Sequence, residues 1–392
     1  MTTTTAPVQR GPVLRTERSL APDLTRGAML LFIALANAAN CAFASQPGID
    51  PTPHGFQRVI NFLMVTLVDS RAYPVFAVMF GYGLIQIARR QEAAGTDARR
   101  VLLRRNGFLV AFGLVHATLL YFGDFLGAYG IVGILATLLL VRRSDKFHRI
   151  SVALWGIQLV YVVLTALPVL SNTPGNATIT NTTNNSLANS SYIGSMMDRI
   201  AEWPMHTVTV IPIIVIVWSG MWAARKGILE NPAAHTRLLK GVAAVGLSVT
   251  VLSALPYAAV AGGWLHVDAA SVDAMAQLHA VGGQFGGPGY VALITLIALR
   301  ISNNRKPNEF VRSVSALGQR SMTGYLFQSV CWVLIFAPFA LDLGGSTEIA
   351  VLAAVGVWAL SLVGARAMDR SGYRGPAEMA LRRLVYKPQG QR

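Results

Sequence analysis

The sequence predicts an all-α integral membrane protein, a polytopic bundle of about ten transmembrane helices. The first observation is composition: 53% of the 392 residues are hydrophobic and only 13% are charged, about half the charged fraction of an ordinary globular chain. The second observation is a series of long apolar runs, and the third is the distribution of Lys and Arg between the loops. Together they exclude a soluble enzyme, a disordered chain and a fibrous protein.

Apolar runs of roughly 17 to 25 residues are needed to cross a hydrocarbon core of about 30 Å. They define one transmembrane domain over 27–366, between an N-terminal segment, 1–26, and a basic tail, 367–392. The apolar stretch 56–68 is too short to cross alone, and we interpret it as an interfacial or re-entrant piece. The predicted spans are about 27–44, 72–88, 103–122, 125–141, 150–170, 205–224, 238–258, 281–299, 314–338 and 347–365.

Positive charge is distributed very unevenly between the two predicted sides of the membrane. All but three of the 33 Lys and Arg residues lie on the side that also holds both termini, and the exceptions are Arg58, Arg71 and Arg199. Because cytoplasmic loops carry an excess of Lys and Arg, both termini are predicted to be cytoplasmic. The net charge of +15 is therefore a topology signal, with attraction to anionic membrane lipid as a secondary effect. No nucleic-acid partner is expected.

An outer polar loop is predicted at 171–203. Its first part is rich in Asn, Thr and Ser, a composition that buries little apolar surface. This composition favours a mobile, solvated linker over a lid above an external site.

Polar side chains inside the predicted spans mark either a cavity or hydrogen bonds between helices. At a rise of 1.5 Å per residue, Asn40, His116 and Gln328 fall at one depth, just beyond the midplane. Both interpretations stay open for the amide and hydroxyl groups, whereas the titratable His116, followed by Asp124 at the outer end of its span, favours function. The further polar positions on the same helix faces are Asn37, Ser321 and Tyr325.

Two groups of charged residues in the loops suggest chemistry. Asp50 and His54 follow the first span, and a His beside a carboxylate is the minimal unit of a general base. His279, before the eighth span, is interpreted as a solvated loop position. Arg104 and Arg105 crowd the start of the third span, where guanidinium groups can clamp phosphates. No metal-ligand spacing, phosphate loop or dinucleotide fingerprint is present, so we expect no metal and no nucleotide cofactor.

Five ordered motifs carry a family resemblance over nearly the whole chain. They are PDLTRGAMLLFIALAN from position 22, YPVFAVMFGYGL from 73, RRNGFLVAFGLVHATLLYFGDFLGAYG from 104, ALGQRSMTGYLFQS from 316 and RGPAEMALRRLVY from 374. With these motifs the chain resembles the YeiB-like bacterial membrane proteins that carry the C-terminal domain of unknown function 418. The resemblance implies a family region at about 205–390 and a multi-pass location in the bacterial cytoplasmic membrane.

The opening and third-span motifs are also similar to those of transmembrane acyltransferases of the heparan-alpha-glucosaminide acetyltransferase type. This resemblance implies transfer of an acyl group from cytosolic acyl-CoA, the co-substrate, to a hydroxyl or amine of a sugar, lipid or small metabolite at the outer face. The implied catalytic residues are His116 or His54 as base, with Asp124 or Asp50 to orient it. The implied cavity residues are Asn37, Asn40, Tyr129, Ser321, Tyr325 and Gln328, and the implied acyl-CoA ligands are Arg26, Arg104, Arg105 and Arg382.

Two other functions stay open at this point. The same polar layer would serve a transporter or exporter of a small amphiphile, although the two halves of the sequence show no visible repeat. A non-catalytic accessory protein that binds lipid or a partner is the third alternative. The sequence also leaves open whether the protein forms a homo-oligomer.

Overall fold

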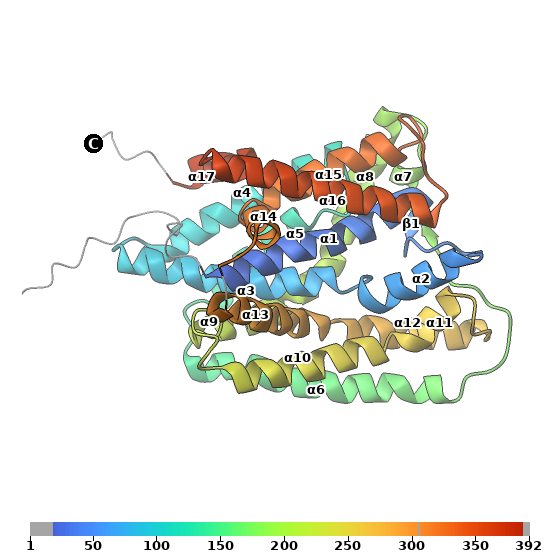
Figure 1. Ribbon diagram of the computed structural model, residues 1–392, viewed down its shortest axis with the longest axis horizontal. Coiled ribbons are helices and arrows are strands. Elements are labelled where there is room, and N and C mark those ends of the chain that lie inside the picture. The colour runs from blue at the N-terminus through green and yellow to red at the C-terminus, as the bar shows by residue number, and fades with distance from the viewer. Residues whose placement is uncertain (1–18, 305, 387–392) are drawn as a thin grey trace, which may run out of the picture.

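The computed structural model describes residues 19–304 and 306–386, and most of them are helical (Figure 1). Two short strands, β1 (Ser45–Gln46) and β2 (Thr182–Thr183), pair antiparallel. The helices are α1 (Leu20–Phe43), α2 (Phe56–Leu67), α3 (Ala72–Ala93), α4 (Ala98–Leu119), α5 (Phe125–Leu139), α6 (Asp145–Leu170), α7 (Asn185–Ala188), α8 (Tyr192–Val210), η2 (Ile211–Ile213), α9 (Ile214–Arg225), α10 (Thr236–Leu252), α11 (Leu255–Ala261), α12 (Ala269–Gly283), α13 (Gly286–Asn304), α14 (Glu309–Gln319), α15 (Ser321–Phe336), α16 (Thr347–Arg370) and α17 (Pro376–Val385).

The long helices run along the long axis of the molecule, as a membrane bundle requires (Figure 1). Within the described chain, five helical segments are long and apolar enough to cross a membrane, and the number rises to seven if each of two bent helix pairs is one span. The pairs are α10 with α11, bent by 40°, and α12 with α13, bent by 43°. Helices α5 and α15 are apolar but shorter. These lengths confirm an all-α membrane protein, and within the described chain they account for up to seven of the ten predicted spans.

Helix α6 shows the surface expected of a protein in lipid. Large apolar side chains are exposed along its outer face, among them Ile157, Val160 and Leu164. In water a patch of this kind would be an aggregation or docking site, whereas hydrocarbon chains cover it without cost. The exposed face therefore agrees with the membrane location indicated by helix length.

Each predicted span overlaps one or more helices, and several spans are interrupted in the structure. The span predicted at 314–338 is divided into α14 and α15 at Arg320. The Arg320 guanidinium is buried and donates to the carbonyl groups of Ala316 and Tyr373, which ties the break to the chain beyond α16. The predicted stretch 56–68 is helical as α2, and together with α3 it forms one apolar segment, Phe56–Ala93.

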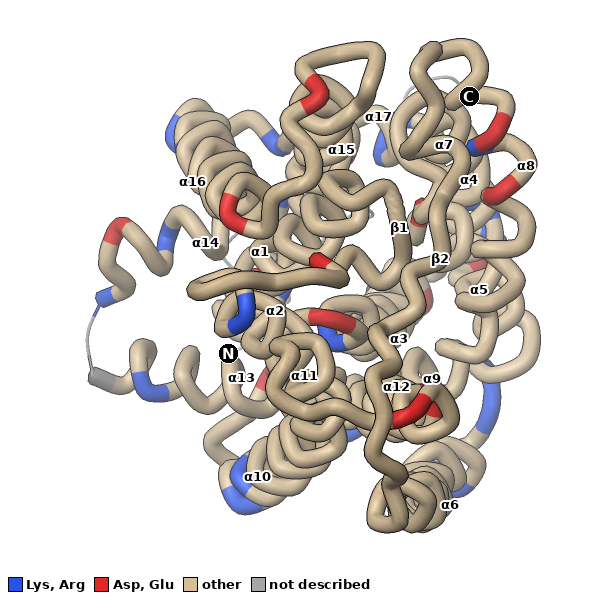
Figure 2. The backbone as a smooth tube through the Cα atoms, turned by 90° about the vertical axis from the view of Figure 1, so that its right-hand side faces the viewer, with Lys and Arg blue, Asp and Glu red and all other residues tan. Residues whose placement is uncertain are grey.

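The predicted outer loop 171–203 is shorter and better packed than expected. Helix α8 already begins at Tyr192, and the extended segment before it crosses the end of the bundle from α6 to α7 (Figure 2). The side chain of Ile179 is buried, and Asn181 donates to the Ile49 carbonyl at 2.7 Å. Most of the segment is exposed, as a solvated linker would be, while Ile179 and Asn181 attach it to the bundle.

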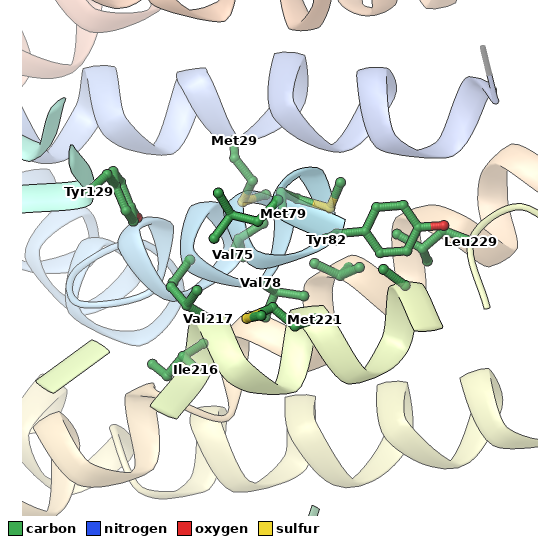
Figure 3. Close-up of a cluster of buried hydrophobic side chains, with 14 of the residues drawn as sticks. Met29, Val75, Val78, Met79, Tyr82, Tyr129, Ile216, Val217, Met221 and Leu229 are labelled. Carbon is green, nitrogen blue, oxygen red and sulfur yellow. The ribbon is translucent and has the colours of Figure 1, made fainter. Parts of the chain in front are cut away.

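The core lies where α1, α3 and α9 meet (Figure 3). Met29 of α1, Met79 of α3 and Met221 of α9 fill the space between the helices. Glycine brings α3 and α9 into backbone contact, since a Cβ added at Gly81 would lie 1.9 Å from the Val217 carbonyl oxygen. Close approach through small residues is the usual way in which membrane helices gain packing energy.

Gly318 allows the same close contact between α14 and α1. A Cβ added there would lie 1.7 Å from the Asp23 carbonyl oxygen, so the variant Gly318→Ala must push the two helices apart. We expect it to lower the free energy of unfolding by about 1–3 kcal/mol, as overpacking does, and to lower the unfolding midpoint in detergent. The control is Gly356→Ala in α16, where an added Cβ meets nothing within 4 Å. Equal midpoints for the two variants would contradict the prediction.

Candidate functional site

A cavity of about 1060 Å³ runs through the centre of the bundle. One face of α3 lines it over the length of the helix, from Tyr73 to Arg90. At a rise of 1.5 Å per residue this stretch covers about 26 Å, which approaches the hydrocarbon thickness of about 30 Å. The cavity therefore extends over most of the membrane-spanning length. The α3 residues along its wall are Ala72, Tyr73, Phe76, Met79, Phe80, Tyr82, Gly83, Gln86, Ile87, Arg90 and Gln91.

The structure places many of the predicted site residues on the wall of this cavity and leaves others away from it. The two Asn residues of α1 lie on the wall because they share one face of the helix. The residues on the wall are Arg26, Asn37, Asn40, Arg105, Tyr129, Ser321, Tyr325 and Arg382. Among the described residues, those that lie away from the wall are Asp50, His54, Arg104, His116, Asp124 and Gln328.

One end of the cavity, which we call the basic end, is lined by guanidinium groups from four elements. Arg26 donates to the Met79 carbonyl at 3.4 Å, and the Arg105 guanidinium lies over the Phe80 ring at 5.5 Å. Burial raises the pKa of the Tyr386 hydroxyl, while the nearby charges of Arg105, Arg382 and Arg90 act in the opposite direction. These charges therefore converge on one place, as a site for phosphate groups requires.

Helix α17 covers the basic end because a carboxylate holds it to α15. Glu378 accepts hydrogen bonds from the backbone N–H groups of Met322 and Thr323 at 2.9 and 3.1 Å and from the Thr323 hydroxyl. Burial raises the pKa of Glu378, and these donors oppose the rise. Thr323 in return accepts from the Ala377 N–H at 3.2 Å. This reciprocal cap brings Arg382 to the cavity and gives Glu378 of the motif RGPAEMALRRLVY a physical role.

The opposite end of the cavity is polar and is covered by the paired strands. Asn40 is fixed there, since its Oδ1 accepts from the Gly48 N–H at 2.9 Å and its Nδ2 donates to the Tyr121 hydroxyl at 3.3 Å. Gln46 of β1 and Thr182 of β2 lie on the wall. The strands therefore cap the end that faces away from the arginines (Figure 2).

His116 and Asp124 form a pair that is sealed from the cavity. His116 Nδ1 lies 2.8 Å from Asp124 Oδ1, and His116 Nε2 lies 2.8 Å from the Ser329 hydroxyl. Both side chains of the pair are 0% exposed. Tyr325, which does line the cavity, packs on the His116 ring at 4.9 Å. The pair joins α4, α5 and α15, and neither the pair nor Ser329 lies on the cavity wall.

The other predicted residues away from the cavity have local partners. Gln328 is buried and donates to the Leu30 carbonyl of α1 at 3.4 Å, which is the contact expected of interhelical hydrogen bonding. The Asp50 carboxylate accepts from the Thr52 N–H at 2.9 Å. His54 is exposed on the same loop. Arg104 is exposed too, and its guanidinium lies over the Phe108 ring at 5.8 Å.

Sequence reasoning missed a histidine–carboxylate pair on the cavity wall. His279 of α12 is buried rather than solvated, so the interpretation as a solvated loop position is wrong. Its Nε2 lies 2.8 Å from Asp69 Oδ2, and both residues line the cavity. The signal in the sequence was indirect: Asp69 follows the short apolar stretch 56–68, and His279 precedes the glycine-rich run 282–289. His206 of α8 also lies on the wall, with its ring 5.4 Å from Phe125.

The fold and the cavity together define a class of protein: a helical membrane protein with a polar-ended cavity through its bundle. Comparison with known proteins then shows what the chain is similar to. Residues 223–388 match the family model DUF418, protein of unknown function. The C-terminal part of the chain is therefore a DUF418 domain, close to the region of about 205–390 expected from the sequence.

One of three relatives matches nearly the whole chain, and the other two match about a third of it. The uncharacterized protein YxaH of Bacillus subtilis (strain 168) is 23% identical over 96% of each chain. An uncharacterized 39.9 kDa protein in the amylase 3' region of Bacillus acidopullulyticus is 31% identical over 32% of this chain and 34% of its own. The uncharacterized protein YeiB of Escherichia coli (strain K12) is 28% identical over 30% of each chain. The predicted resemblance to YeiB-like proteins is confirmed.

Proposed function

We propose that this protein is a ten-span membrane acyltransferase with both termini in the cytoplasm. It would move an acyl group from cytosolic acyl-CoA to a hydroxyl or amine of an acceptor that enters from the outer face. One observation carries the proposal: a single cavity of about 1060 Å³ joins a cluster of guanidinium groups at one end to polar side chains at the other. Its volume is at the upper end of the range for ligand pockets.

The basic end and the middle of the cavity match the two halves of acyl-CoA. Phosphate groups of the nucleotide would bind Arg26, Arg105 and Arg382, because guanidinium pairs with phosphate bidentately. The middle of the cavity, with Phe76 and Phe80 on its wall, would accept the pantetheine arm and the acyl group. The excess of Lys and Arg on this side assigns the basic end to the cytoplasm.

A transporter or exporter of a small amphiphile is the second candidate function. The observation in its favour is that two broken helices, α2–α3 and α12–α13, border the cavity, as in many transporters. A purified enzyme would release free thiol from acyl-CoA, whereas a transporter would show counterflow of substrate in proteoliposomes. A non-catalytic protein would show neither activity.

Binding of acyl-CoA tests the proposal. We expect acetyl-CoA to raise the unfolding midpoint of the detergent-purified protein, since a ligand at a hundredfold excess over its Kd adds about 2.7 kcal/mol. Arg105→Gln should weaken binding about tenfold or more, because a hydrogen bond to a charged group contributes about 1.5–3 kcal/mol. Arg104→Gln is the matched control, with the same charge change at an exposed side chain away from the cavity wall.

Two results would contradict this proposal. The first is an equal shift of the midpoint in the Arg105 and Arg104 variants, which would remove the basic end of the cavity as the binding site. The second is no shift in the wild-type protein with acetyl-CoA or longer acyl-CoAs, which would leave the transporter as the better candidate.

A further inference from the structure

Two breaks in the helices meet beside the cavity. Helix α2 ends at Leu67 and α3 begins at Ala72, and α12 and α13 are divided after Gly283. Ser70 in the first break has a φ of 59°, a conformation that costs energy for a residue with a side chain. A Cβ added at Gly283 would lie 3.0 Å from Arg71 Nη1, so the glycine lets the two breaks touch. Irregular backbone at membrane depth is tolerated where it is buried in protein or lines a cavity.

The side chains of His279 and Asp69 come together where these breaks meet. The distance of 2.8 Å between His279 Nε2 and Asp69 Oδ2 equals that between His116 Nδ1 and Asp124 Oδ1. The two pairs differ in access. The His279 and Asp69 side chains are 4% and 33% exposed and line the cavity, whereas those of His116 and Asp124 are 0% exposed. A molecule in the cavity can therefore reach only the first of these two pairs.

The neighbours of His279 fix which ring nitrogen is available. Asp69, as a carboxylate, accepts a hydrogen bond from Nε2–H, which leaves the Nδ1 lone pair to take a proton. Arg71 is buried, and its Nη1 donates to the Asp69 carbonyl at 2.5 Å and Nη2 to the Thr250 carbonyl at 2.9 Å. Arg71 Nη1 lies at nearly the same distance from both ring nitrogens of His279, 3.2 Å from Nδ1 and 3.1 Å from Nε2. The guanidinium N–H is therefore not directed at the lone pair of one nitrogen alone. The Tyr257 ring packs on the imidazole at 5.2 Å.

The position of the pair along the cavity suits acyl transfer. Asp69 precedes the first turn of α3, and Arg90 lies on the last turn of the same helix. An acyl-CoA held by its phosphates at the basic end would thus extend its thioester along α3 toward the pair. The acceptor would enter from the opposite end, so the two substrates would meet at His279.

We propose that His279 is the general base of the acyl transfer and that Asp69 positions it, an inference that rests on the proposed function. Nδ1 takes the proton from the acceptor O–H or N–H as that oxygen or nitrogen attacks the thioester carbonyl carbon. The C–S bond breaks, and the thiolate of coenzyme A leaves with the bonding electron pair. The thiolate then takes the proton from the imidazolium, which gives an ester or amide and free coenzyme A thiol.

The first test measures release of free thiol from acetyl-CoA by purified protein, with water or glycerol as the acceptor probe. We expect His279→Gln to lower kcat by about 10²–10⁴-fold, the usual contribution of a general base, while the midpoint shift caused by acetyl-CoA is unchanged. Asp69→Asn should lower kcat by a smaller factor and leave the KM for acetyl-CoA unchanged. The control is His266→Ala, which replaces an exposed histidine between α11 and α12 and should retain full turnover.

The second test does not depend on turnover. Diethyl pyrocarbonate acylates accessible neutral imidazole, and mass spectrometry locates the label. We expect label on His279 before His116, because only His279 of these two lines the cavity.

Three outcomes separate this inference from the proposed function. Normal turnover in His279→Gln would overturn the inference and leave the acyltransferase proposal standing. Label on His116 with none on His279 would also overturn the inference and leave the acyltransferase proposal standing. This test gives an answer even if the wild-type protein binds acetyl-CoA without releasing thiol. A wild-type protein that is not stabilised by acetyl-CoA would overturn the proposed function first and the inference with it.

Discussion

Replacement of Asp124 by alanine is expected to lower the free energy of unfolding by about 3–5 kcal/mol, the usual cost of removing one partner of a buried ionisable pair. The Asp124 carboxylate holds His116 and also caps α5, where it accepts from the backbone N–H groups of Leu126 and Gly127 at 3.1 and 2.6 Å. Without it, three donors inside the bundle lose their acceptor. The variant should unfold at a much lower temperature in detergent.

Asp50→Ala is the matched control for this prediction. It removes a carboxylate from an outer loop, where the side chain accepts from one backbone N–H, so we expect a change of at most about 1 kcal/mol. If Asp124→Ala and Asp50→Ala unfold at the same temperature, the pair does not hold α4, α5 and α15 together. A folded Asp124→Ala variant without turnover would instead favour the catalytic role first predicted for His116.

The depth deduced by counting residues is not confirmed, because Gln328 donates to the carbonyl of Leu30, which lies about 15 Å before Asn40 along α1 at 1.5 Å per residue. The direction of a side chain around its helix could not be deduced from the sequence at all. Counting residues placed Asn40, His116 and Gln328 in one layer, and the polar residues of α1 do reach the cavity. His116 turns instead to Ser329, and Gln328 turns to the Leu30 carbonyl. Adjacent helices decide this rotation, and the sequence of one helix holds little information about it.

The same limit separates Arg104 from Arg105. Both belong to one basic cluster, and successive residues on a helix point about 100° apart. Only one of them can therefore face the cavity, and that one is Arg105. The charge count indicated where basic groups gather along the chain, while the choice between neighbours depends on the contact of α4 with α3.

The pair of His279 and Asp69 was beyond sequence reasoning for a different reason. The two residues are far apart in the chain, and each lies beside a helix break that looked like a loop or a weak span. Hydropathy detects continuous apolar helices well, so it describes a broken helix as a short span with polar residues outside. The pairing of His279 with Asp69 becomes visible only in the structure, where the two helix breaks pack against each other.

Replacement of Gly83 by tryptophan should abolish acyl transfer in a protein that still folds. Gly83 lies on the cavity-lining face of α3, and a Cβ added there finds only Arg26 Nη2 within 4 Å, at 3.6 Å. The space beside it is therefore open, and an indole would fill the passage between the arginines and the outer half of the cavity. We expect thiol release from acetyl-CoA to fall below detection, with little change in the unfolding midpoint.

The control for this obstruction of the cavity is Gly107→Trp in α4. Gly107 is exposed on the outside of the bundle, and a Cβ added there meets nothing within 4 Å. It introduces the same side chain without entering the cavity, so turnover should be retained. Normal turnover in Gly83→Trp would mean that the thioester reaches the acceptor by another path. Loss of turnover in Gly83→Trp alone would show that acyl transfer needs this part of the cavity to be open.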